Sequence, residues 1–313
     1  VAGDQGARLG IERGVDHPVD GLSWGSSVAL EFYRLLLGNH PYGHDNLGDT
    51  ISLSQIRRDD LLAFHSTYFV PNNCFIVVVG DANRGDVLKQ IQARFGTWAS
   101  KQVPELKVES VPVPGRLKVK LISRPEMNQT YIQFGHPGIA RSDPDWLANR
   151  LQAYVLGGSA LGSRLGDEVR EKAGLAYDVN ARFDEDRYPG AFEATVQTAK
   201  PKEALRLMFE EIRKMHDQGA TRSELQTAQS YFSGSFPIRY SSNQGKLDVV
   251  TTIELHHLGL DWLERYPKLI QSVTLDEVNK AAREHLYPGR YVMVVMGNTT
   301  KEELGLSDVE WID

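Results

Sequence analysis

The sequence predicts an α+β fold made of two homologous units, of which the first is incomplete at its N-terminal end. Helical and strand-like segments interleave along the chain. Several strands follow one another as hairpin neighbours, which favours an antiparallel or mixed sheet over a doubly wound parallel sheet. One stretch of the first hundred residues returns near the C-terminus with the same order of elements, which indicates an internal repeat.

The first hundred residues contain three helical segments and one strand. Residues 27–37 carry an apolar stripe at helical spacing that ends at a glycine. Residues 56–69 form the second helix, which ends before a proline, and 87–95 form the third. Residues 75–79 are all apolar and are bounded by turn residues, which predicts a buried central strand.

The remaining elements follow a proline-rich stretch. Two later helices begin at capping boxes, because Thr221 precedes Glu224 and Thr274 precedes Glu277 at the required spacing. Further helices are predicted over 146–156, 161–171 and 201–216, and strands over 117–122, 131–134, 175–183, 191–196 and 292–296.

The repeat sets the expected division into domains. A shift of 217 residues lays 54–81 without gaps on 271–298, and both stretches read helix, proline turn, buried strand, glycine. If the second copy begins near Gly115, the first copy begins about a hundred residues before Val1. We therefore expect 1–105 to be the C-terminal part of a first unit, 106–115 to be a linker, and 116–313 to be the second unit.

Composition and charge exclude several classes of function. The 313 residues carry a net charge of −6, and the basic residues are scattered, which speaks against binding to nucleic acid or an anionic membrane surface. No apolar run approaches the ~20 residues that span a bilayer. The single cysteine, Cys74, allows no disulfide framework or thiolate metal cage, and its apolar neighbours predict an inert buried thiol.

The histidines do not form a zinc-protease motif in this chain. Neither His-x-x-Glu-His (HxxEH) nor His-Glu-x-x-His occurs among the nine histidines. His40 and His44 are four residues apart, but a proline and a glycine lie between them, which predicts a turn and no metal site. We therefore expect no metal to be bound by these residues.

The most informative stretch is 156–179, which reads LGGSALGSRLGDEVREKAGLAYDV. Arg170 near a helix end and Tyr177 seven residues later could meet in one cleft, where a guanidinium holds a carbonyl and a phenol donates to an oxyanion. The residues alone favour the simpler interpretation, a surface arginine and a half-buried strand tyrosine.

Four segments resemble the pitrilysin/insulinase family of zinc metallopeptidases and mitochondrial processing peptidases. They are GGSALGSRL, REKAGLAYDV, HPYG at 40–43 and YFVPNNCFIVVVGD at 68–81. The resemblance implies homologous α+β units that close like a clamshell around an extended peptide. It also implies that one unit carries HxxEH and the catalytic zinc, and that the following unit supplies an arginine and a tyrosine, here Arg170 and Tyr177, to the substrate and transition state.

The zinc site of that family is not expected on this chain. Its HxxEH motif would fall before Val1. Catalytic members carry a glutamate ligand in a motif that this chain matches at Ile11, Asp16 and Pro18, but Gly10 stands in the place of that glutamate and Glu12 is two positions off. The resemblance therefore implies that this chain binds no zinc, and that zinc belongs to a missing segment or a partner subunit.

The leading hypothesis is a zinc-free, substrate-holding part of an endopeptidase, inactive alone, that completes an active site with an HxxEH-bearing domain or subunit. That partner is a separate peptidase subunit or, in a homo-oligomer, another copy; in a close variant, the motif precedes Val1 in the same polypeptide. The alternative is a structural or assembly subunit with a degenerate peptidase fold and no proteolysis. Either cytoplasm or bacterial periplasm fits one cysteine.

Overall fold

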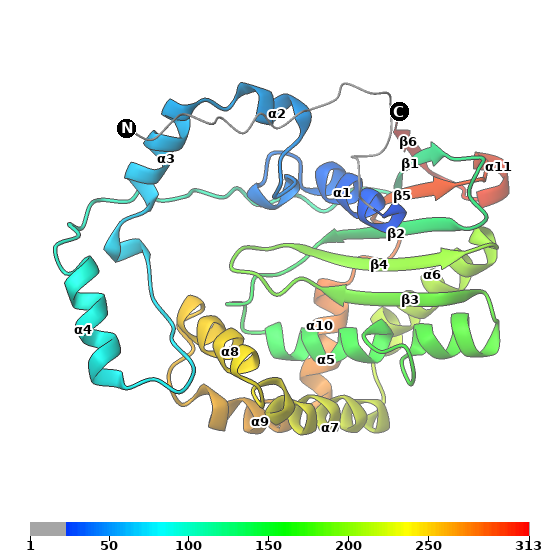
Figure 1. The fold of residues 1–313 in the computed structure, drawn as a ribbon. Helices are drawn as coiled ribbons and strands as arrows, with labels where there is room; N and C mark the ends of the chain where they lie inside the picture. The colour runs from blue at the N-terminus through cyan, green and yellow to red at the C-terminus, as the bar shows by residue number, and fades with distance from the viewer. Residues whose placement is uncertain (1–22, 313) are drawn as a thin grey trace.

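The computed structural model describes residues 23–312. A six-stranded mixed sheet lies at its centre, with the strand order β3-β4-β2-β5-β1-β6 (Figure 1). The pairs of β1 with β5 and with β6 are parallel, and the other three are antiparallel. The strands are β1 (Lys118–Ser123), β2 (Thr130–Pro137), β3 (Ala176–Phe183), β4 (Ala191–Thr198), β5 (Val292–Gly297) and β6 (Glu310–Ile312). Mixed strand order with interleaved helices confirms the predicted α+β class.

Helices surround this sheet unequally. They are α1 (Trp24–Leu37), α2 (Thr50–Gln55), α3 (Arg58–Tyr68), α4 (Arg84–Phe95), α5 (Trp146–Gly157), α6 (Pro201–Gln218), α7 (Arg222–Arg239), α8 (Asn243–Leu255), α9 (Trp262–Ser272), α10 (Leu275–His285) and α11 (Lys301–Leu304), with short helical turns η1 (Pro41–Gly43), η2 (Pro71–Asn73) and η3 (Gly166–Lys172). In Figure 1, α5, α6 and α10 lie on one side of the sheet and α1 lies on the other.

The central strand β5 is apolar on both faces because both faces are covered. Met293 and Val295 belong to the large core beneath α5, α6 and α10. Val292, Val294 and Met296 belong to a smaller core on the opposite face. An uninterrupted apolar run is what such a strand requires, since alternate side chains enter two different cores.

Helix α1 is the cover of that second face. Ser23 caps its first turn by accepting a hydrogen bond from the backbone N–H of Ser26. Its apolar stripe then points at the sheet, and Phe32, at the centre of the stripe, is fully buried. The helix therefore belongs to the N-terminal part of the sequence but packs on strands that lie a hundred or more residues later.

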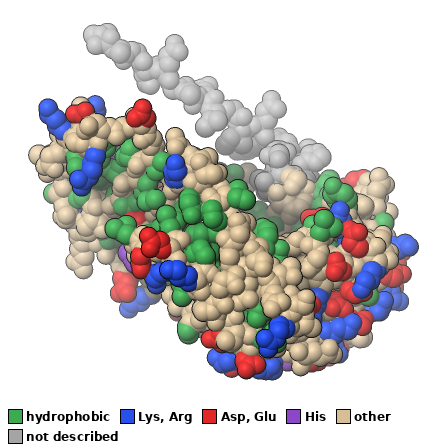
Figure 2. Space-filling view, turned by 90° about the horizontal axis from the view of Figure 1, so that it is seen from below, with side chains coloured by type: hydrophobic (Ala, Val, Ile, Leu, Met, Phe, Trp, Pro, Cys, Tyr) green, Lys and Arg blue, Asp and Glu red, His purple; other side chains and the backbone are tan. Residues whose placement is uncertain are grey.

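Residues 45–110 extend away from the sheet (Figure 1). Their apolar side chains are largely exposed: Ile76 keeps 56% and Val78 keeps 54% of their accessible surface. Seen from below, hydrophobic side chains gather over the left half of the molecule, the half that carries these residues (Figure 2). We call this the exposed apolar surface; its large members are Leu47, Ile51, Leu53, Ile56, Leu61, Leu62, Phe64, Tyr68, Phe69, Phe75, Ile76, Val78, Leu88, Phe95, Trp98 and Leu106.

The prediction of a buried strand over 75–79 is wrong for the described structure. No strand is formed there among residues 23–312, because no other described segment pairs with it. The prediction of a buried thiol is wrong for the same reason, since Cys74 precedes this uncovered segment and is exposed. Apolar sequence alone does not bury a strand, because burial needs neighbouring strands and a covering layer.

Other boundaries differ less from the predictions. The helix predicted over 56–69 forms as α3, which begins at Arg58 and ends at Tyr68, while the short helix α2 before it was not predicted. Both capping boxes, at Thr221 and Thr274, are confirmed. The elements also follow the shift seen in the sequence: α3 and α10 begin and end 217 residues apart, and so do the first residues of α4 and α11. Within residues 23–312, none of the helices combines the length and apolar character of a membrane span.

Candidate functional site

The glycine-rich stretch after α5 allows this helix to approach strand β3 closely. A Cβ atom on Gly157 would lie 2.6 Å from the backbone nitrogen of Ala181 and 2.8 Å from its Cβ. Only glycine therefore fits at this contact. The small residues of this stretch thus allow α5 and β3 to pack in close contact.

Arg164 anchors the same stretch from the other side. Its guanidinium donates to both carboxylate oxygens of Glu224, at 2.7 and 2.9 Å, and to the backbone carbonyl of Gly219 at 2.8 Å. Burial alone would raise the pKa of Glu224, but the hydrogen bonds from Arg164 and Thr221 outweigh it and the pKa is lowered. Arg164, the arginine of GGSALGSRL, therefore has a structural role: it forms a bidentate ion pair with Glu224, the glutamate of the capping box at the start of α7.

Residues 161–171 do not form the continuous α-helix that the sequence predicts. After an irregular loop, η3 is a turn of π-helix that carries Arg170. It ends at Lys172, and two residues later Gly174 has a φ of +61°, in the left-handed region that glycine adopts without strain. The backbone N–H of Leu175 then donates to the carbonyl of Val169 at 2.9 Å, and β3 begins at Ala176. π-Helical turns are frequent at functional sites because they re-aim a side chain by one position.

Arg170 and Tyr177 lie side by side at the start of β3. The guanidinium carbon of Arg170 is 5.5 Å from the ring centroid of Tyr177. Tyr177 keeps 83% of its accessible surface, and Arg170 has only weak polar contacts, at 3.5 Å from Glu171 and from the carbonyl oxygen of Ala160. The two side chains are thus held near each other with their polar groups available to a ligand. Their role stays a prediction.

Strand β3 itself is an edge of the sheet. Among the described residues, no strand pairs with its outer side. A groove of about 730 Å³ runs across the sheet from the first turn of α1 to β3, and we call it the sheet groove. Its lining includes Gln133 on β2, Asn180 on β3 and Thr195 on β4. Edge strands with free backbone groups are the places where extended peptides add to a sheet.

A partly buried polar cluster closes one end of the sheet groove. The hydroxyl of Tyr33, on α1, donates to both carboxylate oxygens of Asp184 at 3.0 Å. Arg182 and Gln133 both donate to Glu193 beside it. Burial, reinforced by the nearby negative charge of Glu193, raises the pKa of Asp184 to about 6. The cluster joins α1 to the sheet.

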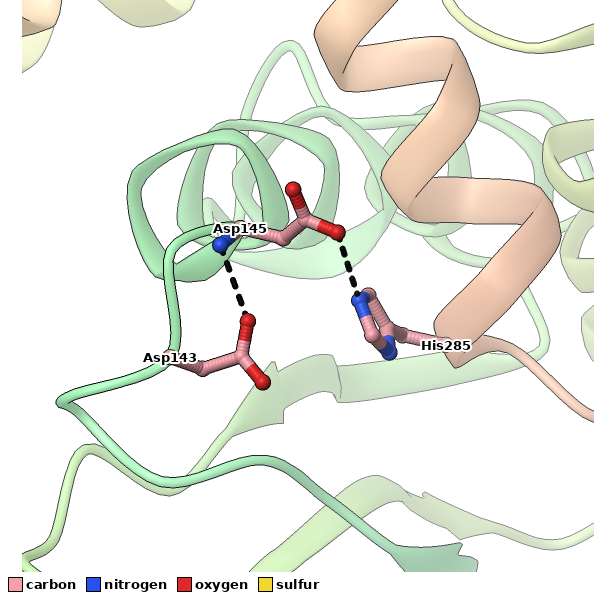
Figure 3. Close-up of side chains that lie close together, drawn as sticks. All are labelled: Asp143, Asp145 and His285. Atoms are coloured by element: carbon pink, nitrogen blue, oxygen red, sulfur yellow. Dashed lines mark hydrogen bonds and ion pairs between the residues drawn. The ribbon is translucent and has the colours of Figure 1, made fainter.

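One group of side chains has the composition of a metal site. Asp143, Asp145 and His285 offer ligand atoms that all lie within 4.8 Å of one another (Figure 3). However, one carboxylate oxygen of Asp145 lies 3.2 Å from Nε2 of His285 and 3.3 Å from Nζ of Lys280. A zinc ion would have to displace that ammonium group, so the donor set does not fit zinc. The group is an ion pair that ties the start of α5 to the end of α10.

The turn predicted between His40 and His44 is confirmed. His40 precedes the turn η1, and its Nδ1 accepts a hydrogen bond from the backbone N–H of Tyr42 at 3.1 Å. The glycine and glutamate singled out in the zinc-ligand comparison, Gly10 and Glu12, lie outside the described residues.

A family model described as "Peptidase M16 inactive domain" matches residues 55–232, more than half of the chain. The chain belongs to this family. An uncharacterized zinc protease of Mycobacterium tuberculosis is 26% identical over 276 residues, which are 87% of this chain and 62% of that protein. A "non-peptidase homolog" of Helicobacter pylori is 25% identical over 281 residues, 88% of this chain and 63% of that protein. The chain thus spans less than two thirds of the length of these relatives.

Solved structures with a closely similar fold include the following two. A "peptidase M16 inactive domain" from Pseudomonas fluorescens is 31% identical, covers 88% of this chain and 66% of its own, and has a TM-score of 0.78. A chain of complex III₂ from Candida albicans is 16% identical, covers 90% and 68%, and has a TM-score of 0.77. The membership confirms the resemblance to the pitrilysin/insulinase peptidases drawn from the sequence.

Sequence reasoning missed the partly buried cluster around Asp184 and a pocket of arginines beneath β3. Asp184, Arg182 and Glu193 follow no motif, and their partner Tyr33 lies about 150 residues earlier. The one available signal was Glu193, the single charged residue of the segment that forms β4, because a charge inside a strand that becomes buried needs a partner.

Proposed function

We propose that this chain is the zinc-free, substrate-holding part of a zinc-dependent endopeptidase that acts on extended peptides. The observation that carries the proposal is the pairing of Arg170 with Tyr177 at the start of an edge strand. Membership in the M16 inactive-domain family supports it, as do relatives called zinc proteases. On its own the chain is expected to be inactive.

The two side chains supply complementary contacts to a peptide bond. The guanidinium of Arg170 has several N–H donors in a fixed plane, which suits a carbonyl or carboxylate of the bound peptide. The hydroxyl of Tyr177 donates one hydrogen bond to the oxyanion that forms when the carbonyl is attacked. The backbone of β3 holds the peptide extended by adding it to the sheet.

The metal chemistry is assigned to another domain or subunit. Within residues 23–312, the one group with a metal-like composition already binds Lys280, so no zinc is expected there. An HxxEH-bearing segment is expected either in the same polypeptide before this chain or in a separate subunit, including one provided by a homo-oligomer. The resemblance to the processing peptidases suggests this arrangement, in which one part of the enzyme binds zinc and another part holds the substrate.

The test compares the rates of peptide cleavage by variants of this chain, each mixed with a subunit that bears HxxEH. The product of the gene next to the one that encodes this chain is the first candidate for that subunit. Arg170→Ala and Tyr177→Phe should each lower the rate of peptide cleavage by about a hundredfold, the usual effect of removing an oxyanion donor. Arg222→Ala and Tyr287→Phe, away from this pair and outside the exposed apolar surface, are the controls and should leave the rate unchanged. If the Arg170→Ala and Tyr177→Phe variants both keep full cleavage activity, the proposed role is refuted.

A second candidate is a structural or assembly subunit without proteolysis. The name "non-peptidase homolog" of the Helicobacter pylori relative favours it, together with the exposed apolar surface. In that case the chain binds neither zinc nor peptide, and the Arg170 and Tyr177 variants have no effect. Ile76→Ser with Val78→Ser would instead weaken assembly with the partner, which size-exclusion chromatography of the mixture would measure.

A further inference from the structure

A second cavity lies beneath strand β3, on the helical side of the sheet. It has a volume of about 190 Å³ and is enclosed by α5, α7 and the end of β3. Its walls are largely aromatic, and three arginines also line it: Arg150 from α5, Arg182 from β3 and Arg239 from the end of α7. We call it the arginine cavity. The aromatic rings on its walls are Trp146, Tyr154, Phe183, Tyr231 and Phe232.

The positive charge in the arginine cavity exceeds the negative charge. Arg150 keeps only 13% of its side-chain surface, and its guanidinium carbon lies 4.5 Å from the ring centroid of Phe232. It forms an ion pair with Glu185 at 3.1 Å, but Arg141 binds the same carboxylate oxygen at 3.4 Å. One carboxylate therefore serves two guanidinium groups.

The hydrogen-bonding capacity of these arginines is also incompletely used. The buried Nε atom of Arg150, which lines the cavity, has no partner among the described residues; neither has that of Arg141, which lies behind the cavity wall beside Glu185. Arg239 forms no ion pair within residues 23–312, although it lines the cavity. Buried donors without partners are costly, so a ligand that accepts hydrogen bonds and carries negative charge would be stabilised here.

The position of the arginine cavity relates it to the edge of β3. Ala181 and Phe183 of β3 line it, and Gly158 and Arg182 line both this cavity and the sheet groove. A peptide added along β3 would send alternate side chains to opposite faces of the sheet. Those on the helical side, next to the small residues Gly158 and Ala181, would point into the cavity.

We propose that the arginine cavity is a specificity pocket for an acidic side chain, aspartate or glutamate, of an extended peptide bound along β3. This inference rests on the proposed function, because it requires a peptide on the edge strand. It adds the substrate class: peptides with a carboxylate on the helical side of the strand. A carboxylate there would meet the guanidinium groups of Arg150 and Arg239, and the surrounding aromatic rings would lower the local dielectric constant and strengthen the ion pair.

The experiment measures binding of fluorescein-labelled peptides to the full chain by fluorescence anisotropy. Two sets of peptides with strong strand propensity are identical except that one position, scanned along the peptide, holds glutamate in one set and glutamine in the other. At one position the glutamate peptide should bind roughly tenfold to a hundredfold more tightly, as expected for hydrogen bonds to a charged group. Glutamine is nearly isosteric, so the comparison isolates the charge.

Three variants connect this preference to the cavity. Arg239→Gln, at an exposed position on the rim, should reduce the preference for glutamate without unfolding the chain. Glu185→Gln should increase the preference, because it removes the carboxylate that competes for Arg150. Arg222→Gln, at the opposite end of α7, makes the same charge change away from the cavity and should leave the preference unchanged.

The outcomes separate this inference from the proposed function. If glutamate and glutamine peptides bind equally at every position, the acidic pocket is wrong while peptide holding by β3 stands. If the preference exists but Arg239→Gln and Glu185→Gln do not change it, the assignment to this cavity is overturned. If no peptide of either set binds, both the inference and the proposed function fail.

Discussion

The buried carboxyl of Asp184 should make the stability of the chain depend on pH in a direction opposite to that of most acidic residues. Its two oxygens accept hydrogen bonds from Tyr33, and one also accepts from the backbone N–H of Ala191 at 2.8 Å. Burial raises its pKa from the ordinary 3.8 to about 6. The folded chain therefore holds a proton that the unfolded chain has released at intermediate pH.

The sign and size of the effect follow from linkage. Between about pH 4 and pH 6 the native state binds more protons at Asp184 than the unfolded state, so the free energy of unfolding falls as the pH rises through this window. A shift of this size corresponds to about 3 kcal/mol for a fully shielded group, and to about 2 kcal/mol after allowance for its partial exposure. Above about pH 6 the contribution levels off.

Asp184→Asn tests this reasoning. The amide keeps one acceptor oxygen and loses the titration, so the stability of the variant relative to the native chain should increase by about 2 kcal/mol between pH 4 and pH 7. Urea unfolding followed by tryptophan fluorescence measures it. Asp178→Asn, at an exposed position on the same strand, is the control. A stability difference between Asp184→Asn and the native chain that stays constant across this pH range would refute the argument.

Three further predictions concern the packing and exposure of single residues. Arg164→Ala should destabilise the chain by about 2 to 3 kcal/mol in urea unfolding, because it leaves Glu224 and a carbonyl without their donor. Gly157→Ala should cost about 2 kcal/mol through its clash with β3, whereas Gly234→Ala, with open space around it on α7, should stabilise by about 0.5 kcal/mol; thermal melts compare the two. Cys74 should react fully with a thiol reagent in the folded chain, and slow labelling that quickens only in denaturant would contradict its exposure.

Much of the second half of the fold could be predicted from the sequence. Its helices begin at local signals such as the capping box of Thr274 with Glu277, and the structure begins α10 at the next residue. A strand with one covered face alternates apolar and polar residues, whereas a strand with two covered faces is apolar throughout, as β5 is. These patterns are local, so a single sequence contains them.

Features that depend on distant segments could not be predicted in the same way. Whether 75–79 is buried depends on strands that would have to pair with it, and its own apolar residues say nothing about their presence. The π-helical turn at η3 carries no local sequence signal that distinguishes it from the α-helix predicted over 161–171. The arginine cavity brings together Arg150, Glu185 and Arg239, which share no motif and lie on three separate elements.

The position of α1 has a practical consequence for dividing the molecule. A cut at the predicted linker, 106–115, would remove the helix that shields Val292, Val294 and Met296, although the whole sheet would remain. Such a shortened chain would expose an apolar sheet face to water and should aggregate. A chain that keeps 23–37 together with the sheet should stay monodisperse. We therefore expect the smallest folding unit to combine 23–37 with the sheet, two segments that are not contiguous in the sequence.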